Sequence, residues 1–228
     1  QITKASEIPE IMAKAFYIAR SGRPGPVLID ITKDAQFETF DFGYEKCTGV
    51  RSYTPSTTLS NDALEKALEL IDKAKKPFVV WGQGIILGNA EKELQEFLEK
   101  SGIPAAWTIL GLSALPTDHP SNRGMVGMHG NYAPNLLTNE CDLLIAIGMR
   151  FDDRVTGDLK TYAKQAKIIH LELDPAEVNK NVNVDIALLS DCKISLRELN
   201  KRIKTNSYPD WVARFDSLDK IEYKKVIE

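Results

Sequence analysis

The fold is decided by the run Leu143-Leu144-Ile145-Ala146-Ile147 and the loop that follows it at once, Gly148-Met149-Arg150-Phe151-Asp152-Asp153-Arg154-Val155-Thr156-Gly157. An unbroken aliphatic run that ends in glycine is typical of a strand buried on both faces, with a loop at its carboxyl end. That edge of an open parallel sheet is where ligands bind. The guanidinium groups of Arg150 and Arg154 suit a phosphate or a carboxylate. The sequence therefore predicts a ligand-binding loop behind a central strand.

Candidate strands and helices alternate from Ser60 onward, which is the pattern of a parallel sheet covered by helices. Hydrophobic periodicity predicts strands at residues 77–81, 104–108, 143–147, 167–171 and 186–189. It predicts helices at residues 63–74, 89–100, 134–139, 159–165 and 193–203, with a long glycine-containing loop over residues 111–131. We therefore expect an α/β fold, a Rossmann-like, doubly wound parallel sheet of five or six strands with helices on both faces.

The two ends of the chain suggest a different organisation. Apolar residues at helical spacing between Ile8 and Ala19 predict a helix, and residues 26–31 predict a buried strand. One helix and one strand cannot build a core, so we expect residues 1–35 either to belong with a part of the protein that is absent here or to pack on the next unit. We expect a linker at 36–58, the main domain at 59–205 and the start of a second linker at 206–228. Because both termini lie in helical patterns, we expect an excised piece of a longer protein.

Composition narrows the classes of partner. Lys and Arg number 29, Asp and Glu number 32, and the net charge of -3 is spread along the chain, so nucleic acid is not an expected partner. Cys47, Cys141 and Cys192 are far apart and form no Cys-x-x-Cys motif, which favours a reducing compartment over a disulfide framework. No apolar run is long enough to span a bilayer. We expect a soluble, cytoplasmic protein without a membrane partner.

A second glycine-rich turn, Gly82-Gln83-Gly84-Ile85-Ile86-Leu87-Gly88, lies between a predicted strand and a predicted helix, as in dinucleotide-binding proteins. The usual nicotinamide fold places a ribose-binding acid after its second strand. Here that strand ends in Trp107-Thr108-Ile109, and the acid is Glu172, which follows a later strand. A plain nicotinamide site is therefore less favoured, and a glycine turn without a ligand stays open.

The other candidate motifs indicate no catalytic group. His129, in Gly127-Met128-His129-Gly130, has no second histidine at metal-binding spacing. Asp152 and Asp153 stand between two arginines, so ion pairing or helix capping is favoured over a magnesium site. The sequence Gly111-Leu112-Ser113-Ala114-Leu115 lacks the second glycine of a nucleophile elbow. Glycines, arginines and one acid at successive strand ends predict binding, and no catalytic or metal-binding residue is expected.

Three of these stretches resemble a known family. Residues 21–31, Ser-Gly-Arg-Pro-Gly-Pro-Val-Leu-Ile-Asp-Ile, resemble the close of the first domain of thiamine diphosphate enzymes. Residues 127–130, and above all residues 148–157, resemble acetohydroxyacid synthases, also called acetolactate synthases. The resemblance covers nearly the whole chain. It implies the end of a pyrimidine-binding domain, a complete thiamine diphosphate enzyme central domain and the start of the linker to a diphosphate-binding domain.

The resemblance implies that the central domain binds FAD along the carboxyl edge of its sheet. The expected contacts of the pyrophosphate and ribityl portions are Arg23, Gly82, Gln83, Gly84 and Arg150. Those of the flavin region are Thr108, Ile109, Leu110, Gly127, Met128, His129, Arg154 and Val155. Those of the adenosine end are Glu172, Leu173, Glu177 and Asp191, and Gly148 and Met149 complete the expected set. Glu172 also suits ribose hydroxyl groups on chemical grounds, and the arginines suit a pyrophosphate.

The chain departs from the family pattern at two places: Gln83 interrupts what is often a run of three glycines, and Ser190-Asp191-Cys192 stands where Gly-Asp-Ala is common. It also lacks the glutamate that activates thiamine and the Gly-Asp-Gly...Asn motif that binds metal and diphosphate. Thiamine diphosphate and Mg²⁺ are therefore expected in regions outside this chain, and the fragment is expected to be inactive.

The resemblance also implies a function for the full-length protein. It would be a transferase that condenses two pyruvates, or pyruvate and 2-oxobutanoate, with loss of CO2 in branched-chain amino acid biosynthesis. The expected partners are the missing domains, a second copy in a homodimer or homotetramer, and a small regulatory subunit. The alternatives are the central domain of a glyoxylate carboligase or a flavin oxidase, and a sirtuin-like NAD-binding domain.

Overall fold

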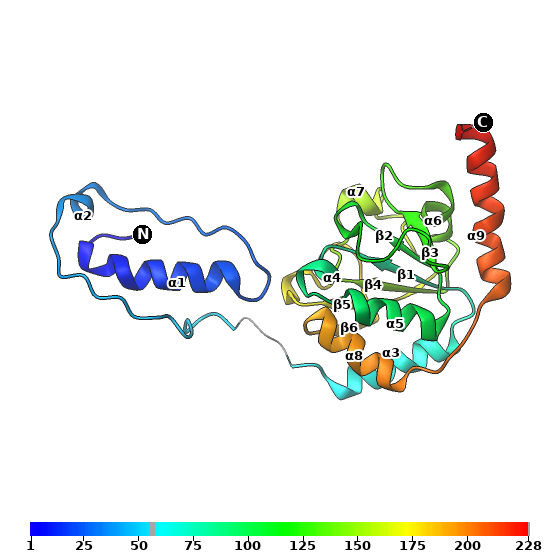
Figure 1. The fold of residues 1–228 in the computed structure, drawn as a ribbon, viewed down its shortest axis with the longest axis horizontal. Coiled ribbons are helices and arrows are strands. Elements are labelled where there is room, and N and C mark those ends of the chain that lie inside the picture. Colours follow the sequence, from blue (N-terminus) through cyan, green and yellow to red (C-terminus); the bar gives the residue numbers. More distant parts are fainter. Residues whose placement is uncertain (55–57, 228) are drawn as a thin grey trace. The chain divides into compact units, whose positions relative to one another are not determined.

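The computed structural model describes residues 1–54 and 58–227, which fall into two compact units, Gln1–Thr57 and Thr58–Glu228 (Figure 1). Of the linker expected at residues 36–58, residues 55–57 lie outside the described residues.

Unit 1 contains short helices and extended chain. The 3-10 helix η1 (Ala5–Glu7) leads into α1 (Ile8–Arg20), which confirms the predicted helix, and α2 (Lys33–Phe37) follows. The strand predicted at residues 26–31 is wrong: the described residues form a single parallel bridge, Ile2 to Ile31, and Leu28 is 94% exposed. A strand needs a neighbouring strand to accept and donate its backbone hydrogen bonds, and the described residues of unit 1 offer residues 26–31 a single bridge partner, Ile2.

Unit 2 is built on one parallel sheet. Its strands in the described residues are β1 (Pro77–Trp81), β2 (Ala105–Trp107), β3 (Asn122–Met125), β4 (Leu143–Ile147), β5 (Lys167–Glu172) and β6 (Ile186–Leu189). They are arranged in the order β3-β2-β1-β4-β5-β6, and every pairing is parallel. This confirms the doubly wound α/β fold. The strand order reverses between β1 and β4, so the loops at the carboxyl ends of these two strands stand at the position where such sheets bind ligands.

Helices cover the sheet in two groups. The first, α3 (Asn61–Lys73), α5 (Glu91–Ser101) and α8 (Cys192–Arg202), pack on one another and lie together on one side of the sheet in Figure 1. In the second group, α6 (Tyr132–Leu137) packs on α9 (Pro209–Glu222), and the π-helical turn η4 (Tyr223–Ile227) continues α9. The short elements α4 (Gly84–Leu87), η2 (Ile109–Gly111), α7 (Asp153–Thr156) and η3 (Pro175–Glu177) follow strand ends.

The core lies between these helices and the two central strands. Every residue of β1 and β4 is buried, as their aliphatic sequences predict. Trp81, at the end of β1, is fully buried, and its Nε1 donates a hydrogen bond of 2.9 Å to the carbonyl oxygen of Gly111. This bond satisfies the indole N–H inside the core. It also fixes the chain that follows β2 against the end of β1.

Unit 2 differs from the sequence prediction first at β3 and α7. The edge strand β3 lies inside the stretch expected to be a long loop, because its sequence Asn-Arg-Gly-Met lacks the β-branched and aromatic residues that indicate a strand. The helix predicted at residues 159–165 is replaced by turns, and a helical turn forms earlier, at α7. Asp152 begins α7 because its side chain accepts a hydrogen bond from the backbone N–H of Arg154.

The linker predicted from residue 206 is wrong for residues 209–222, which form α9. Trp211, Phe215 and Leu218 recur at helical spacing and are buried in the same core as β1. Arg214 forms a two-pronged contact with Glu140, with distances of 2.8 and 3.3 Å to the two carboxylate oxygens. The polar residues between the apolar ones hide this pattern, because they occupy the exposed side of an amphipathic helix.

Candidate cofactor-binding site

The turns that follow β1 and β4 touch each other through glycine. The backbone N–H of Gly84 donates to the carbonyl oxygen of Gly148 at 2.9 Å, and the N–H of Gly82 donates to that of Ile147 at 2.9 Å. A Cβ atom at Gly84 would lie 2.5 Å from the Cα of Gly148, and Gly148 has a φ of +56°. Sequence reasoning expected these glycines to admit a ligand. The structure shows that they also allow two backbones to pack together at the switch point.

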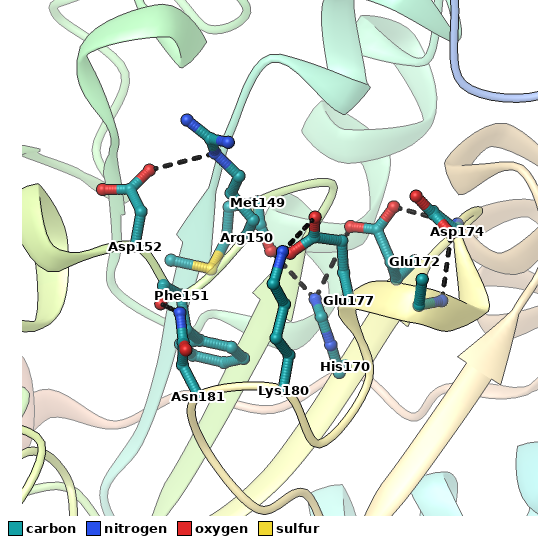
Figure 2. Close-up of polar contacts among 11 residues, drawn as sticks. Met149, Arg150, Phe151, Asp152, His170, Glu172, Asp174, Glu177, Lys180 and Asn181 are labelled. Atoms are coloured by element: carbon teal, nitrogen blue, oxygen red, sulfur yellow. Dashed lines mark hydrogen bonds and ion pairs between the residues drawn. The ribbon is translucent and has the colours of Figure 1, made fainter.

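The arginine loop presents its first guanidinium group to solvent. The side chain of Arg150 is 57% exposed, and its Nε lies 3.3 Å from an Asp152 carboxylate oxygen. Figure 2 draws this ion pair as a dashed line. The other Asp152 oxygen accepts the backbone N–H of Arg154 at 3.0 Å and caps α7. The ion pairing and the helix capping expected here are therefore both observed for Asp152. The remaining N–H groups of an exposed guanidinium can bind an anion.

Glu172 is held in place at the carboxyl end of β5. It is 8% exposed, and its Oε1 accepts the backbone N–H groups of Leu173 at 3.0 Å and Asp174 at 3.1 Å. Its Oε2 lies 3.6 Å from the Nε2 of His170. Glu177, in η3, pairs with Lys180 at 3.1 Å (Figure 2). A carboxylate oriented by two backbone amides at a strand end is suited to accept hydrogen bonds from a diol.

The loop around residues 127–130 packs on the start of α7. The N–H of Met128 donates to the carbonyl oxygen of Arg154 at 2.8 Å, and a Cβ at Gly127, whose φ is +110°, would lie 2.6 Å from that oxygen. Asn135 bonds both backbone groups of Gly127, at 2.8 and 2.9 Å. Met128 is 62% exposed and His129 is exposed. Gly127, Met128, Arg154 and Val155, which the sequence predicts to lie near a flavin, are thus brought together.

A pocket of about 340 Å³ adjoins this loop, between α6 and α7. Its lining includes Gly127, Met128, Arg154, Val155 and Tyr162.

The residues after β2 and β6 complete the edge. The N–H of Thr108 donates to the carbonyl oxygen of Trp81 at 2.9 Å, which places Thr108 beside the Gly82 turn. Ile109 and Leu110 follow on η2 and are 63% and 60% exposed. Asp191 begins α8, with its Oδ1 accepting the N–H of Lys193 at 2.8 Å.

The predicted site residues in unit 2 follow the carboxyl ends of β1 to β6 and therefore share one edge of the sheet. Arg23 belongs to unit 1 and is not placed relative to this edge.

Sequence reasoning assigned no role to three polar residues that organise the site. Asn135 holds Gly127, Asn181 donates to the carbonyl oxygen of Phe151 at 2.6 Å, and the Nε2 of His170 lies 2.9 Å from the carbonyl oxygen of Met149. The sequence could have identified His170. It is a polar residue among aliphatic ones in the predicted strand, and it stands two positions before Glu172, so both side chains lie on the same face of the sheet. The sequence gives no such signal for the asparagines: Asn181 lies in a polar stretch, and nothing around Asn135 links it to Gly127.

Two chemical features limit what the described residues can do. They contain no group of three or more His, Cys, Asp or Glu side chains able to hold a metal ion. Burial raises the pKa of the Cys192 thiol beneath the Gly148 turn, with nearby acids adding to the effect, so this thiol is not a ready nucleophile.

No helix in the described part of the chain is long and apolar enough to cross a membrane.

Comparison with known proteins identifies relatives along almost the whole chain. The family described as "Thiamine pyrophosphate enzyme, central domain" matches residues 64–199. A probable acetolactate synthase large subunit of Methanococcus aeolicus is 41% identical over 96% of the chain, and the acetolactate synthase isozyme 2 large subunit of Escherichia coli is 42% identical over 92%. The acetolactate synthase large subunit of Buchnera aphidicola is 38% identical over 98%. The matched regions cover 39%, 37% and 41% of these relatives, so the chain spans about two fifths of their length.

Proposed function

The chain belongs to the family defined by the central domain of thiamine pyrophosphate enzymes, and on that premise we propose that it is the FAD-binding portion of an acetolactate synthase large subunit. One observation carries the proposal. The Gly82 turn, Arg150 and Glu172 follow β1, β4 and β5, which are neighbours in a parallel sheet and so end at the same edge. Glycine backbone, guanidinium and carboxylate are what a long dinucleotide needs at successive points along such an edge.

The chemistry of the side chains matches the parts of FAD. Arg150 supplies positive charge and N–H donors for the pyrophosphate, beside the backbone of Gly82, Gln83 and Gly84. Glu172 supplies a carboxylate for the adenosine ribose, with Leu173, Glu177 and Asp191 at the same end. The exposed apolar side chains of Ile109, Leu110 and Met128 provide a surface for a ring system. Thr108, Gly127, His129, Arg154 and Val155 border that surface.

In the full-length protein this domain would bind and orient. Its own residues would hold the nucleotide and shield the ring from water, and none would act as acid, base or nucleophile. FAD, when bound, would have a structural role in a reaction without net redox change. The whole protein would be a transferase that condenses two pyruvates, or pyruvate and 2-oxobutanoate, with loss of CO2. Regions outside this chain would bind thiamine diphosphate and Mg²⁺.

We assign unit 1 to the close of the pyrimidine-binding domain, over residues 1–35, and to the connection that follows. Its exposed Leu28 and Phe37, at 94% and 79%, are apolar surface that the absent part of that domain would cover. The further partners proposed are a second copy, in a homodimer or homotetramer, and a small regulatory subunit. The proposed compartment is the cytoplasm.

The proposal is tested by titrating the full-length protein, and in parallel this chain, with FAD and with NAD. Saturable quenching of flavin fluorescence is expected with FAD, and NAD at equal concentration should not displace the flavin. Binding of NAD without FAD would instead favour the sirtuin-like alternative.

A second assay tests whether the catalytic groups lie outside this chain. This chain, supplied with pyruvate, thiamine diphosphate, Mg²⁺ and FAD, should form no acetolactate, whereas the full-length protein should form it. Turnover by the chain alone would show that the catalytic groups are not outside it. Oxygen-dependent flavin turnover by the full-length protein, without acetolactate, would favour a flavin oxidase.

A further inference from the structure

His170 is a buried polar residue that the proposed cofactor contacts do not include. It lies in β5 with no exposed surface, and its Nε2 is 2.9 Å from the carbonyl oxygen of Met149, in the loop that follows the neighbouring strand β4. The same atom is 3.6 Å from a carboxylate oxygen of Glu172. Figure 2 shows the imidazole beneath the backbone of the arginine loop, between that loop and the acids that follow β5.

The hydrogen-bond chemistry defines the tautomer of this histidine. Met149 offers a carbonyl oxygen, which can only accept, so the proton is on Nε2. Among the described residues, Nδ1 has no hydrogen-bond partner. Burial lowers the pKa of His170, and the bond to Met149 opposes this only in part. The imidazole is therefore a neutral donor aimed at the loop.

The loop is held on both sides of Arg150. On one side, His170 binds the carbonyl of Met149; on the other, Asn181 binds that of Phe151 at 2.6 Å. The ring of Phe151 also packs edge-on against His170, with 5.0 Å between centroids. Arg150 is thus an exposed side chain on a backbone anchored at its two neighbours.

We propose that His170 is a positioning residue that sets the place of Arg150 relative to Glu172, and so the fit of the diphosphate–ribose part of a dinucleotide. This inference rests on the proposed function, because it concerns residues assigned to FAD. His170 itself touches no cofactor. Its donor ties the loop after β4 to the strand that ends in Glu172, so the guanidinium and the carboxylate are kept at one separation before a ligand arrives.

The test compares substitutions that differ in reach. In the full-length protein, His170→Gln keeps an N–H donor at about the distance of Nε2, His170→Asn carries the same amide one bond short, and His170→Leu removes the donor. FAD dissociation constants are measured by flavin fluorescence, and apoprotein unfolding temperatures are measured alongside. Loss of one buried hydrogen bond predicts an FAD dissociation constant about tenfold higher for Asn and Leu. The Gln variant should stay within about threefold of wild type.

Each outcome separates this inference from the one it rests on. If the wild-type protein does not bind FAD, the proposed function fails and this inference fails with it. If wild type binds FAD and the Asn and Gln variants bind it equally well, or equally poorly, the positioning role alone is overturned. Weaker FAD binding by the Asn variant than by the Gln variant, at matched unfolding temperatures, supports it, and the reverse order overturns it. That comparison holds even if the Leu variant does not fold.

Discussion

The backbone N–H of Gly84 bonds the carbonyl oxygen of Gly148 at 2.9 Å, so the turns that follow β1 and β4 form one packed unit at the switch point of the sheet. This contact explains why glycine is required at both positions, because a Cβ atom on either residue would clash with the backbone of the other turn.

Replacing Gly84 with alanine should destabilise unit 2. The added Cβ would lie 2.5 Å from the Cα of Gly148, and backbone cannot move aside as a flexible side chain can. Overpacking of this kind costs about 1–3 kcal/mol in the free energy of unfolding. Denaturant unfolding measures the change. The control is Gly43→Ala, whose Cβ would meet nothing within 4 Å. Equal stability of the two variants would contradict the packing argument.

Truncating the side chain of Trp211 should destabilise unit 2, because α9 packs on the core of this unit. Its ring is buried, and its Nε1 donates to the carbonyl oxygen of Pro77 at 2.8 Å, at the start of β1. Trp211→Ala should cost about 3–5 kcal/mol in the free energy of unfolding, and Trp211→Phe less, because the ring volume is partly kept. Ala213→Ser, on the exposed side of the same helix, should stay within about 0.5 kcal/mol. If Trp211→Ala unfolds like wild type, residues 209–222 would be a linker after all.

Neutralising Glu172 should weaken FAD binding. Glu172→Gln keeps the size of the side chain, but hydrogen bonds to a charged group are worth about 1.5–3 kcal/mol, which corresponds to a dissociation constant roughly 10–100 times higher. Flavin fluorescence titration measures it. Glu69→Gln on α3, where the carboxylate is 67% exposed, is the matched control and should bind FAD as wild type does. An unchanged affinity in Glu172→Gln would remove the ribose assignment.

Exchanging Arg150 for lysine tests the pyrophosphate contact. Lysine keeps the charge but loses the planar fork that binds two oxygens at once, so FAD affinity should fall even though the net charge is unchanged. The control is Arg214→Lys. Arg214 lies on α9 and pairs with Glu140, so this variant makes the same arginine-to-lysine exchange at a residue outside the proposed FAD contacts. Titrations at several salt concentrations should show weaker FAD binding as salt rises. Equal affinities for wild type and Arg150→Lys would speak against a forked contact.

The buried His170 should make the protein less stable in mild acid. Burial lowers its pKa in the folded state below the ordinary value of 6.5, so the unfolded chain takes up a proton first as pH falls. The free energy of unfolding should therefore decrease as the pH falls below about 6.5. This one group contributes a slope of up to about 1.4 kcal/mol per pH unit. The carboxylates of Glu172 and Glu177 face the imidazole. The charge of Glu177 raises the pKa of His170 and so opposes the effect of burial, which narrows the pH range over which stability changes.

Denaturant unfolding between pH 5 and 7.5 measures this slope. His170→Gln should show a shallower slope, since glutamine does not titrate. Identical slopes in the two proteins would mean that the buried imidazole does not control this transition.

The sequence alone determined five of the six strands in the described part of the sheet. A short aliphatic run such as Leu143–Ile147 is typical of a parallel strand covered on both faces, and the glycine after it predicts the edge where a ligand binds. It also named Gly82, Arg150 and Glu172, since charged or glycine residues directly after buried strands must meet at one edge.

Tertiary structure decided the rest. β3 pairs because β2 offers it backbone partners, and α9 is ordered because the core covers Trp211 and Phe215; neither partner can be seen in the local pattern. The strand predicted at residues 26–31 does not form, for the converse reason that unit 1 supplies almost no neighbour. The role of His170 depends on a carbonyl 21 positions away in sequence, a contact that exists only once β4 and β5 lie side by side.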